Sequence, residues 1–171
     1  GEAGLARGLR GLAARALLKR LRRWDLRAAA RVTAFAANSR FVAERIRRAY
    51  GREARVIHPP VDVGRFALGE RKEDFYLSVS RLVPYKRVDL LVEAFGRLGD
   101  RRLVVIGDGP QLGALRARAG DNVTLLGYQD DVSLADHLRQ ARALVFAGVE
   151  DFGIVPVEAQ ACGTPVVALG R

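Results

Sequence analysis

The sequence has no methionine and one cysteine, Cys162, among its 171 residues. A single cysteine excludes an internal disulfide framework and is typical of the reducing cytosol. No apolar run approaches the roughly 18 residues of a membrane-spanning helix. The first segment also lacks the uninterrupted apolar stretch of a signal peptide, because arginines recur throughout it. With 49% hydrophobic and 28% charged residues, the composition excludes a mainly disordered chain and is ordinary for a globular domain.

The motifs of metal hydrolases and serine nucleophiles are also missing. The sequence holds no CxxC, HExxH, DxD or GxSxG pattern. His58 and His137 have neither a second histidine nor a suitably spaced carboxylate nearby, so we interpret both as structural or surface residues. Cys162 fits a small buried packing residue. The sequence therefore predicts no metal site.

The charge is distributed unevenly. Residues 1–55 carry 15 Lys and Arg against 4 Asp and Glu, a net charge of +11, whereas residues 56–171 carry 14 against 15. Leucines recur near helical spacing between the arginines of residues 4–24, which predicts a basic amphipathic helix. Such a helix favours a partner surface or an anionic membrane. Nucleic acid is disfavoured, because Trp24 is the one aromatic residue in this helix.

The rest of the chain alternates between strand-like and helix-like segments. A helix is predicted over residues 40–49, with Asn38 or Ser39 as its N-cap and Gly51 as its stop. Apolar runs of strand length follow at residues 55–57, 75–80, 103–106, 123–126, 143–146 and 165–169. Helical stretches lie between them at residues 88–98, 110–119, 133–141 and 154–162. Continuously apolar strands that alternate with helices predict an α/β fold, a Rossmann-like parallel sheet with flanking helices.

In such sheets ligands bind beyond the carboxyl ends of the strands. The segments that follow the predicted strands are residues 58–60, 80–86, 107–110, 127–128 and 148–153, and four of these five carry glycine or a cation. That composition fits a phosphate-bearing ligand, although glycine is common in strand-to-helix turns. Arg81 and Lys86 could offer a fork and a point charge to a phosphate, or could simply face solvent. Gly107 and Gly109 fit either a tight turn or a close approach of nucleotide to the backbone.

The segment from Glu150 to Pro165 is the most informative one. Pro156 suits the first turn of a helix, so we expect that helix to begin near Ile154, with Glu150 before it and Glu158 in its first turn. The carboxylates could merely complement the helix dipole. Alternatively, the N–H groups of Phe152, Gly153 and Ile154 could hold a phosphate while the two carboxylates accept hydrogen bonds from sugar or ribose hydroxyls. That second interpretation predicts a ligand that is both polyhydroxylated and anionic.

Six stretches together resemble one family. They read NSRFVAERIRRAYG, VIHPPVDVGRF, YLSVSRLVPYKRVDLLVEAF, LVVIGDGP, VTLLGY and EDFGIVPVEAQACGTPVVA. In this order they resemble the C-terminal domain of the group 1 (family four) retaining glycosyltransferases of the GT-B fold. The family signature of two glutamates separated by seven residues is met by Glu150 and Glu158. The residues of these motifs are similar to those of bacterial mannosyltransferases of surface-polysaccharide assembly.

The resemblance implies a role for each matching residue. Arg81 and Lys86 would bind the donor diphosphate, Glu150 would contact the donor sugar, and Glu158 would hold the ribose hydroxyls. Backbone amides would face the sugar and phosphates in the loop formed by Phe152, Gly153 and Ile154. The nucleotide side would be lined by Gly107, Gly109, Gly127 and Tyr128. Cations take the place of a metal in this family, so no metal or other cofactor is expected.

The resemblance also implies a domain organisation. Residues 1–37 are interpreted as the tail and linker of a missing N-terminal acceptor domain, and residues 38–171 as a donor-binding domain truncated at its C-terminal end. The expected enzyme moves a hexose, mannose from GDP-mannose, to a hydroxyl acceptor in surface-glycan or glycolipid assembly. It would act in the cytoplasm or peripherally at the inner face of the membrane, and the fragment alone is expected to be inactive. The alternative is a basic membrane-surface or nucleic-acid binding module with a non-catalytic Rossmann-like domain.

Overall fold

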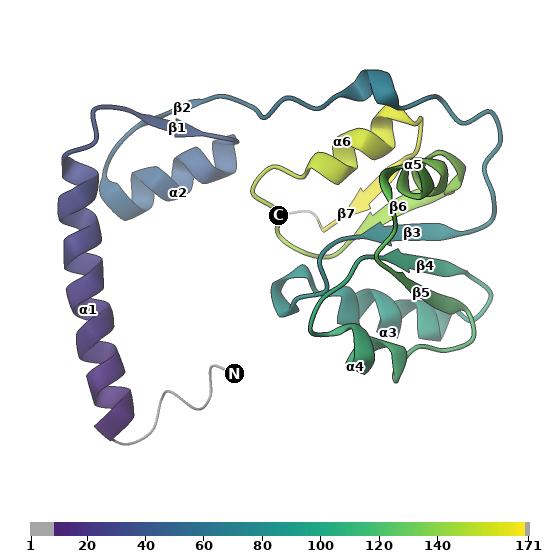
Figure 1. The fold of residues 1–171 in the computed structure, drawn as a ribbon, viewed down its shortest axis with the longest axis horizontal. Coiled ribbons are helices and arrows are strands. Elements are labelled where there is room, and N and C mark those ends of the chain that lie inside the picture. The colour runs from purple at the N-terminus through teal and green to yellow at the C-terminus, as the bar shows by residue number, and fades with distance from the viewer. Residues whose placement is uncertain (1–8, 170–171) are drawn as a thin grey trace. The chain divides into compact units, whose positions relative to one another are not determined.

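The computed structural model describes residues 9–169 of the chain. The chain divides into two compact units between His58 and Pro59, and each unit is described by itself below (Figure 1). The sequence instead predicted a boundary between residues 37 and 38. The difference arises because the backbone of residues 38–58 closes on the first unit through a strand pair that the sequence pattern did not reveal.

The first unit holds two helices and a small parallel sheet. Its elements are α1 (Leu9–Ala30), β1 (Phe35–Ala37), α2 (Arg40–Tyr50) and β2 (Ala54–Val56). Strand β2 pairs with β1, so the prediction that residues 55–57 belong to the main sheet was wrong, and residues 58–60 do not follow one of its strands. The sequence did not predict β1, because this strand has only three residues, Phe-Ala-Ala, and two of them have small side chains. So short a segment does not stand out as an apolar run.

Local capping fixes the ends of α2 as predicted. The Ser39 hydroxyl accepts a hydrogen bond from the Val42 N–H at 3.1 Å, and Gly51 ends the helix with φ at 64°. A left-handed residue at this point is the usual signal that stops a helix, and glycine adopts it without strain. Helix α1 begins at Leu9 and runs six residues beyond the predicted end at Trp24, and residues 4–8 of the predicted helix lie outside the described residues.

The second unit contains a five-stranded sheet. The strands are β3 (Tyr76–Val79), β4 (Leu103–Ile106), β5 (Val123–Gly127), β6 (Ala143–Phe146) and β7 (Val166–Ala168). The connecting helices are α3 (Val88–Leu98), α4 (Leu112–Arg116), α5 (Asp131–Gln140) and α6 (Ile154–Ala161), with short 3₁₀ turns η2 (Val63–Arg65) and η3 (Pro84–Lys86). All four neighbouring pairs are parallel, in the order β5-β4-β3-β6-β7. The predicted Rossmann-like α/β fold is confirmed.

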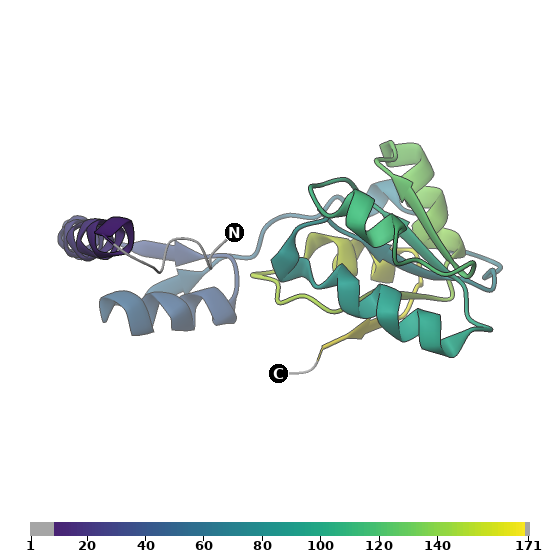
Figure 2. The same cartoon turned by 90° about the horizontal axis from the view of Figure 1, so that it is seen from below.

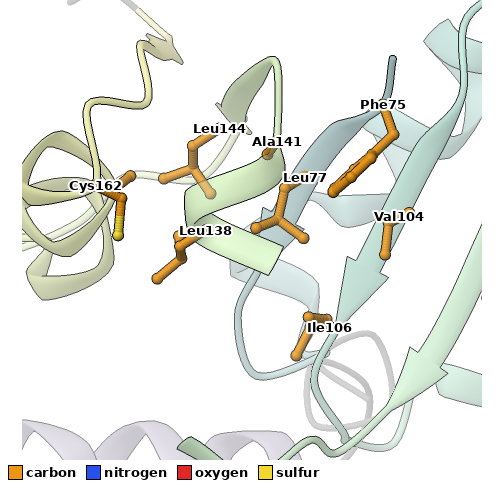
Figure 3. Packing of buried hydrophobic residues seen from close by; sticks show 9 residues of the cluster. Phe75, Leu77, Val104, Ile106, Leu138, Ala141, Leu144 and Cys162 are labelled. Carbon is orange, nitrogen blue, oxygen red and sulfur yellow. The ribbon is translucent and has the colours of Figure 1, made fainter. Parts of the chain in front are cut away.

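Helices cover both faces of this sheet (Figures 1 and 2). On one face Leu77 and Leu144 of the sheet pack with Leu138 and Cys162 from the α5 and α6 side, as Figure 3 shows. On the other face Leu103 and Val105 pack against residues of α3 and α4. Strand β4 is buried at every position, whereas the outer strands β5 and β7 are partly exposed. Burial on both faces therefore holds for the centre of the sheet and not for its outer strands.

The strand order contains one switch point. The chain builds β3, β4 and β5 outward in one direction, then returns to lay β6 on the other side of β3. In open α/β sheets ligands bind in the crevice beyond the carboxyl ends of the strands at such a point. The topology thus directs attention to the loops that follow β3 and β6. No helix within residues 9–169 is long and apolar enough to cross a membrane.

Candidate functional site

The loops after β3 and β6 meet through an ion pair at the switch point. The ammonium of Lys86 contacts the carboxylate of Glu150 directly, and the two side chains are only 12% and 28% exposed. Gly148 allows this approach, because a Cβ at its position would lie 3.0 Å from the Lys86 Cα and carbonyl oxygen. Two residues that the sequence singled out 64 positions apart are thereby brought together.

The backbone around Lys86 is unusual. Lys86 ends the 3₁₀ turn η3, and its ammonium also lies 5.2 Å from the centre of the Tyr85 ring. The next residue, Arg87, has φ at 53° and is the one non-glycine residue in the left-handed region among residues 9–169. Such a conformation costs of order 1–2 kcal/mol for an L-residue and concentrates at functional sites. No sequence signal indicated it, since arginine has no preference for left-handed backbone.

Arg81 lies on the same loop but remains exposed, and it forms no ion pair with the part of the chain that the structure describes. Its loop is tied to the loop after β4 by two backbone hydrogen bonds. The Leu82 N–H donates to the Asp108 carbonyl at 2.8 Å, and the Gln111 N–H donates to the Leu82 carbonyl at 3.1 Å. The loop that carries Arg81 is therefore held against the loop after β4, while the Arg81 side chain is exposed.

The glycines after β4 are required by this loop contact. A Cβ at Gly107 would overlap the Ser80 carbonyl oxygen, and one at Gly109 would lie 2.5 Å from the Leu82 carbonyl oxygen. Both glycines have positive φ, at 138° and 154°. Their missing side chains are explained by protein packing, which favours the tight-turn interpretation of this motif. Pro110 is followed by α4, which begins two residues later at Leu112 and is shorter than predicted.

The loop after β4 also contacts the carboxyl end of the neighbouring strand β5. The Gly107 N–H donates to the Gly127 carbonyl at 2.8 Å, so these two predicted nucleotide-side glycines are neighbours. Gly127 is buried, whereas Tyr128 is 77% exposed and presents its ring beyond the strand. An exposed aromatic ring at this place offers a flat surface on which a base could stack.

The N-terminus of α6 adjoins Glu150. Gly153 is the N-cap, with φ at 85°, and a Cβ there would lie 3.8 Å from the Glu150 Cβ. Since glycine has no side chain, it cannot accept a hydrogen bond from the first-turn N–H groups as Ser or Asp would. Ile154 is exposed and Phe152 is half-buried at this end of the helix. The helix begins at Ile154 as predicted.

Glu158 lies one step further along α6 than predicted. It is the fifth residue of the helix, so the expectation that it belongs to the first turn was wrong. It is half-buried, and this burial raises the pKa of its carboxyl, while the nearby charge of Arg65 opposes the shift and Asp131 adds to it. The charges that shift the pKa of Glu158 are therefore those of Arg65 and Asp131.

Sequence reasoning missed Arg65 and Asp131. Arg65, in η2, forms an ion pair with Asp131 at the start of α5, with its guanidinium 2.8 Å from the carboxylate. The two residues line a hollow with Ala67, Val132 and Asp136. Arg65 lies within the quoted stretch VIHPPVDVGRF, but nothing in a single sequence shows that this segment passes beside Glu158.

The remaining candidates have structural explanations. The His137 Nδ1 lies 2.7 Å from the Ser133 carbonyl oxygen, with its ring edge against Phe75, and Cys162 is buried in the core. Burial raises the pKa of the Cys162 thiol, which makes it a poor nucleophile. The His58 Nδ1 lies 2.9 Å from the Asn38 carbonyl oxygen. Within residues 9–169 there is no group of three or more His, Cys, Asp or Glu side chains that could hold a metal ion.

A family model described as "Glycosyl transferases group 1" matches residues 62–169. The chain belongs to the group 1 glycosyltransferases. The match begins close to the unit boundary and includes the whole five-stranded sheet. The resemblance seen in the sequence motifs is thus confirmed for the family and for the fold.

Relatives of this group 1 glycosyltransferase domain carry similar names. A "D-inositol 3-phosphate glycosyltransferase" of Mycobacterium sp. (strain KMS) is 38% identical over 138 residues, 66% of this chain and 31% of the relative. AviGT4, described as a glycosyltransferase involved in avilamycin A biosynthesis, is 30% identical with a TM-score of 0.66, over 80% of this chain and 44% of AviGT4. The chain thus spans about a third of the curated relative it matches.

A third comparison concerns the fold alone. The crystal structure of Anabaena HepE in complex with UDP and glucose has a TM-score of 0.72 and 22% identity, over 86% of this chain and 47% of HepE. The same protein is also known in complex with UDP-glucose, with a TM-score of 0.71. These two structures share the fold of this chain.

Proposed function

We propose that this chain supplies the donor half-site of a glycosyltransferase and binds a nucleoside diphosphate hexose beyond the carboxyl ends of β3 and β6. The observation that carries the proposal is the contact of Lys86 with Glu150 at the switch point of the sheet. A cation suited to phosphate and a carboxylate suited to hydroxyls meet at one place. A sugar nucleotide presents both groups next to each other.

Each predicted site residue has a role in this proposal. Lys86 supplies a point charge and Arg81 a planar fork to the diphosphate. The N–H groups of Gly153 and Ile154, at the start of α6, add the partial positive charge of a helix N-terminus. Glu150 accepts hydrogen bonds from the sugar. Glu158 holds the ribose hydroxyls, and the Phe152 N–H is a further donor from the loop before α6. The nucleotide is lined by Gly107, Gly109, Gly127 and Tyr128.

The chemistry requires positioning and charge neutralisation. The bond between the anomeric carbon and the phosphate oxygen breaks while a new bond forms to the acceptor oxygen, and the acceptor's proton passes to the departing phosphate. Arg81 and Lys86 would stabilise the negative charge that develops on this leaving group. Attack from the same face of the sugar retains the anomeric configuration. The acceptor must be held within about 3–3.5 Å of the anomeric carbon, which demands a second wall to the site.

Donor binding is proposed to need no divalent metal, because Arg81 and Lys86 would supply the positive charge that a metal otherwise brings to the diphosphate. Isothermal titration calorimetry with UDP-glucose and GDP-mannose, in EDTA and again with magnesium, tests this. Binding of equal strength in both buffers is expected, and Arg81→Met should weaken it about 10-fold or more. Binding that requires magnesium would refute the metal-free site.

The donor base and sugar are the finer part of the proposal. The motif wording favours mannose from GDP-mannose, transferred to a hydroxyl in surface-glycan or glycolipid assembly. UDP and glucose in HepE make UDP-glucose the natural competitor. In the same titrations GDP-mannose should bind more tightly than UDP-glucose. The reverse order would replace the predicted donor and leave the nucleotide-sugar site intact.

We propose further that α1 docks on an anionic membrane surface on the cytoplasmic side. Leu17, Leu21 and Trp24 fall on one face of the helix at i, i+4 and i+7 spacing, and they border a hollow together with Arg20. Trp24 is 67% exposed. Along α1 the lysine and arginines stand against a single acid, Asp25. Exposed Leu and Trp beside Lys and Arg are typical of interfacial helices.

Liposome flotation decides this second proposal. Vesicles with anionic lipid should capture the chain, and Leu21→Ser with Trp24→Ser should abolish capture, whereas neutral vesicles should capture little. Arg97→Ser with Leu98→Ser, on exposed positions of α3, serves as the matched control and should leave flotation unchanged. Equal flotation of the α1 variant and the control would contradict docking through this face.

A further inference from the structure

We propose that Glu150 makes the site discriminate between a sugar nucleotide and the free nucleoside diphosphate, so that the product nucleotide is repelled once the sugar has left. This inference rests on the proposed function and assigns the Lys86–Glu150 pair a task within it. The carboxylate attracts one ligand and opposes the other, while the same ammonium serves both.

The geometry leaves a phosphate at Lys86 no way to avoid Glu150. The ammonium and the carboxylate are in direct contact, and the Lys86 side chain is largely buried. Gly148 packs on the Lys86 backbone, so the loop that carries Glu150 is fixed against the loop that carries Lys86. Any anion that reaches the ammonium therefore lies within a few ångströms of the carboxylate, where charges interact strongly in a partly buried site.

The two ligands differ in what they present to that carboxylate. The diphosphate of a sugar nucleotide is esterified at both ends and carries one negative charge on each phosphate. Its sugar hydroxyls can donate hydrogen bonds to Glu150. The free nucleoside diphosphate has lost those hydroxyls, and the phosphate that carried the sugar is now terminal and no longer esterified to it. The second ionisation of such a terminal phosphate occurs near pH 6. At neutral pH it therefore carries an additional negative charge.

Transfer itself creates this difference. When the glycosidic bond forms, the acceptor's proton goes to the leaving phosphate oxygen, and at neutral pH the terminal phosphate then releases it to water. The carboxylate that held the sugar now faces a more highly charged group with no donor between them. Arg81 and Lys86 attract both ligands whether or not Glu150 is charged, so the part of the discrimination that depends on Glu150 is the repulsion from its carboxylate. Arg87 is paired with Asp89.

The test compares free and sugar-bearing nucleotides on the intact chain. Calorimetry with GDP, UDP, GDP-mannose and UDP-glucose is carried out on the wild type, on Glu150→Gln and on Asp151→Asn. Asp151 is exposed and adjacent, so its substitution removes the same charge from the same loop. Glu150→Gln should tighten free nucleoside diphosphate roughly 10-fold and weaken the sugar nucleotide. Asp151→Asn should change both ligands by less than about 2-fold.

Two further readouts keep the outcome decisive. Stopped-flow release of the free nucleoside diphosphate should slow in Glu150→Gln, because the repulsion acts on the bound product. Glu150→Asp keeps the charge on a shorter side chain and should preserve the discrimination against free nucleotide. If free and sugar-bearing nucleotides weaken together in Glu150→Gln, the inference is overturned and the donor site stands. If the wild type binds none of the four ligands, the proposed function itself fails.

Discussion

At the scale of single residues, Glu158 shows a conflict between stability and function. Burial raises the pKa of its carboxyl above the ordinary value of 4.5, so the folded state holds the proton more tightly than the unfolded state does. At pH values above the raised pKa, the ionised Glu158 therefore lowers the free energy of unfolding. This loss disappears as the pH falls below 4.5, where the carboxyl is protonated in both states. In its proposed role Glu158 would accept hydrogen bonds from ribose hydroxyls as the ionised carboxylate, which would make the residue useful despite its cost.

Glu158→Gln should accordingly separate the two effects. We expect a higher melting temperature near neutral pH, a gain that shrinks as the pH is lowered toward 4.5, and weaker nucleotide binding. Thermal denaturation across this pH range and calorimetry measure the two effects. Glu70→Gln, at an exposed position, is the control and should change neither. A gain in melting temperature that persists unchanged at low pH would contradict the assigned cause.

Arg87 provides a test of backbone strain beside the site. Its φ of 53° suits glycine, whose missing Cβ removes the steric cost. Arg87→Ala loses the contact with Asp89 and keeps the strain, whereas Arg87→Gly loses the same contact and relieves the strain. Arg87→Gly should therefore be about 1 kcal/mol more stable than Arg87→Ala in urea denaturation. If the alanine variant were as stable as the glycine variant, the strain would be absent.

At the scale of elements, Lys72 joins the ends of two helices. Its ammonium donates to the Arg139 carbonyl at 2.7 Å, to the Cys162 carbonyl at 3.2 Å and to the Thr164 hydroxyl at 2.6 Å. These acceptors lie at the C-terminal ends of α5 and α6, where carbonyls lack helical partners and the dipole attracts a cation. Asp131 lies at the opposite end of α5, and Glu158 lies in the middle of α6.

Removing this clamp should loosen both helices. We expect Lys72→Met to lower the free energy of unfolding by about 1.5–3 kcal/mol. The hydrogen bonds from a charged donor are lost, and the buried Thr164 hydroxyl no longer receives one from Lys72. Urea denaturation measures the change. Arg71→Met removes the same charge from the neighbouring exposed position and should cost little. Equal losses in the two variants would show that charge, and not the clamp, matters.

The elements also show what a single sequence can predict. The bounds of α3, β4 and β6 agree with the predicted ranges, because strong apolar patterns and clear turns enclose them. Strand β1 was missed, and β2 was assigned to the wrong sheet, since three-residue strands leave no periodic signal. The loops of the site followed from the rule that ligands bind at the carboxyl edge. The Arg65–Asp131 pair and the left-handed Arg87 did not, because both depend on contacts between distant segments.

At the scale of the whole molecule, sheet order turns scattered motifs into a site. Lys86 and Glu150 become neighbours only because β6 returns to lie beside β3, after β4 and β5 have extended the other edge. A different strand order with the same local elements would separate them. The central claim is therefore that the ammonium at this switch point binds the diphosphate of a nucleotide.

The most direct test is calorimetry of GDP and UDP in EDTA on the wild type and on Lys86→Met, with Arg97→Met as the control. Arg97 is an exposed cation in the last turn of α3, at the end of that helix away from Lys86. Loss of a charged hydrogen bond worth about 1.5–3 kcal/mol predicts roughly 10- to 100-fold weaker binding for Lys86→Met and none of this loss for Arg97→Met. Equal affinities for Lys86→Met, Arg97→Met and the wild type would contradict the account.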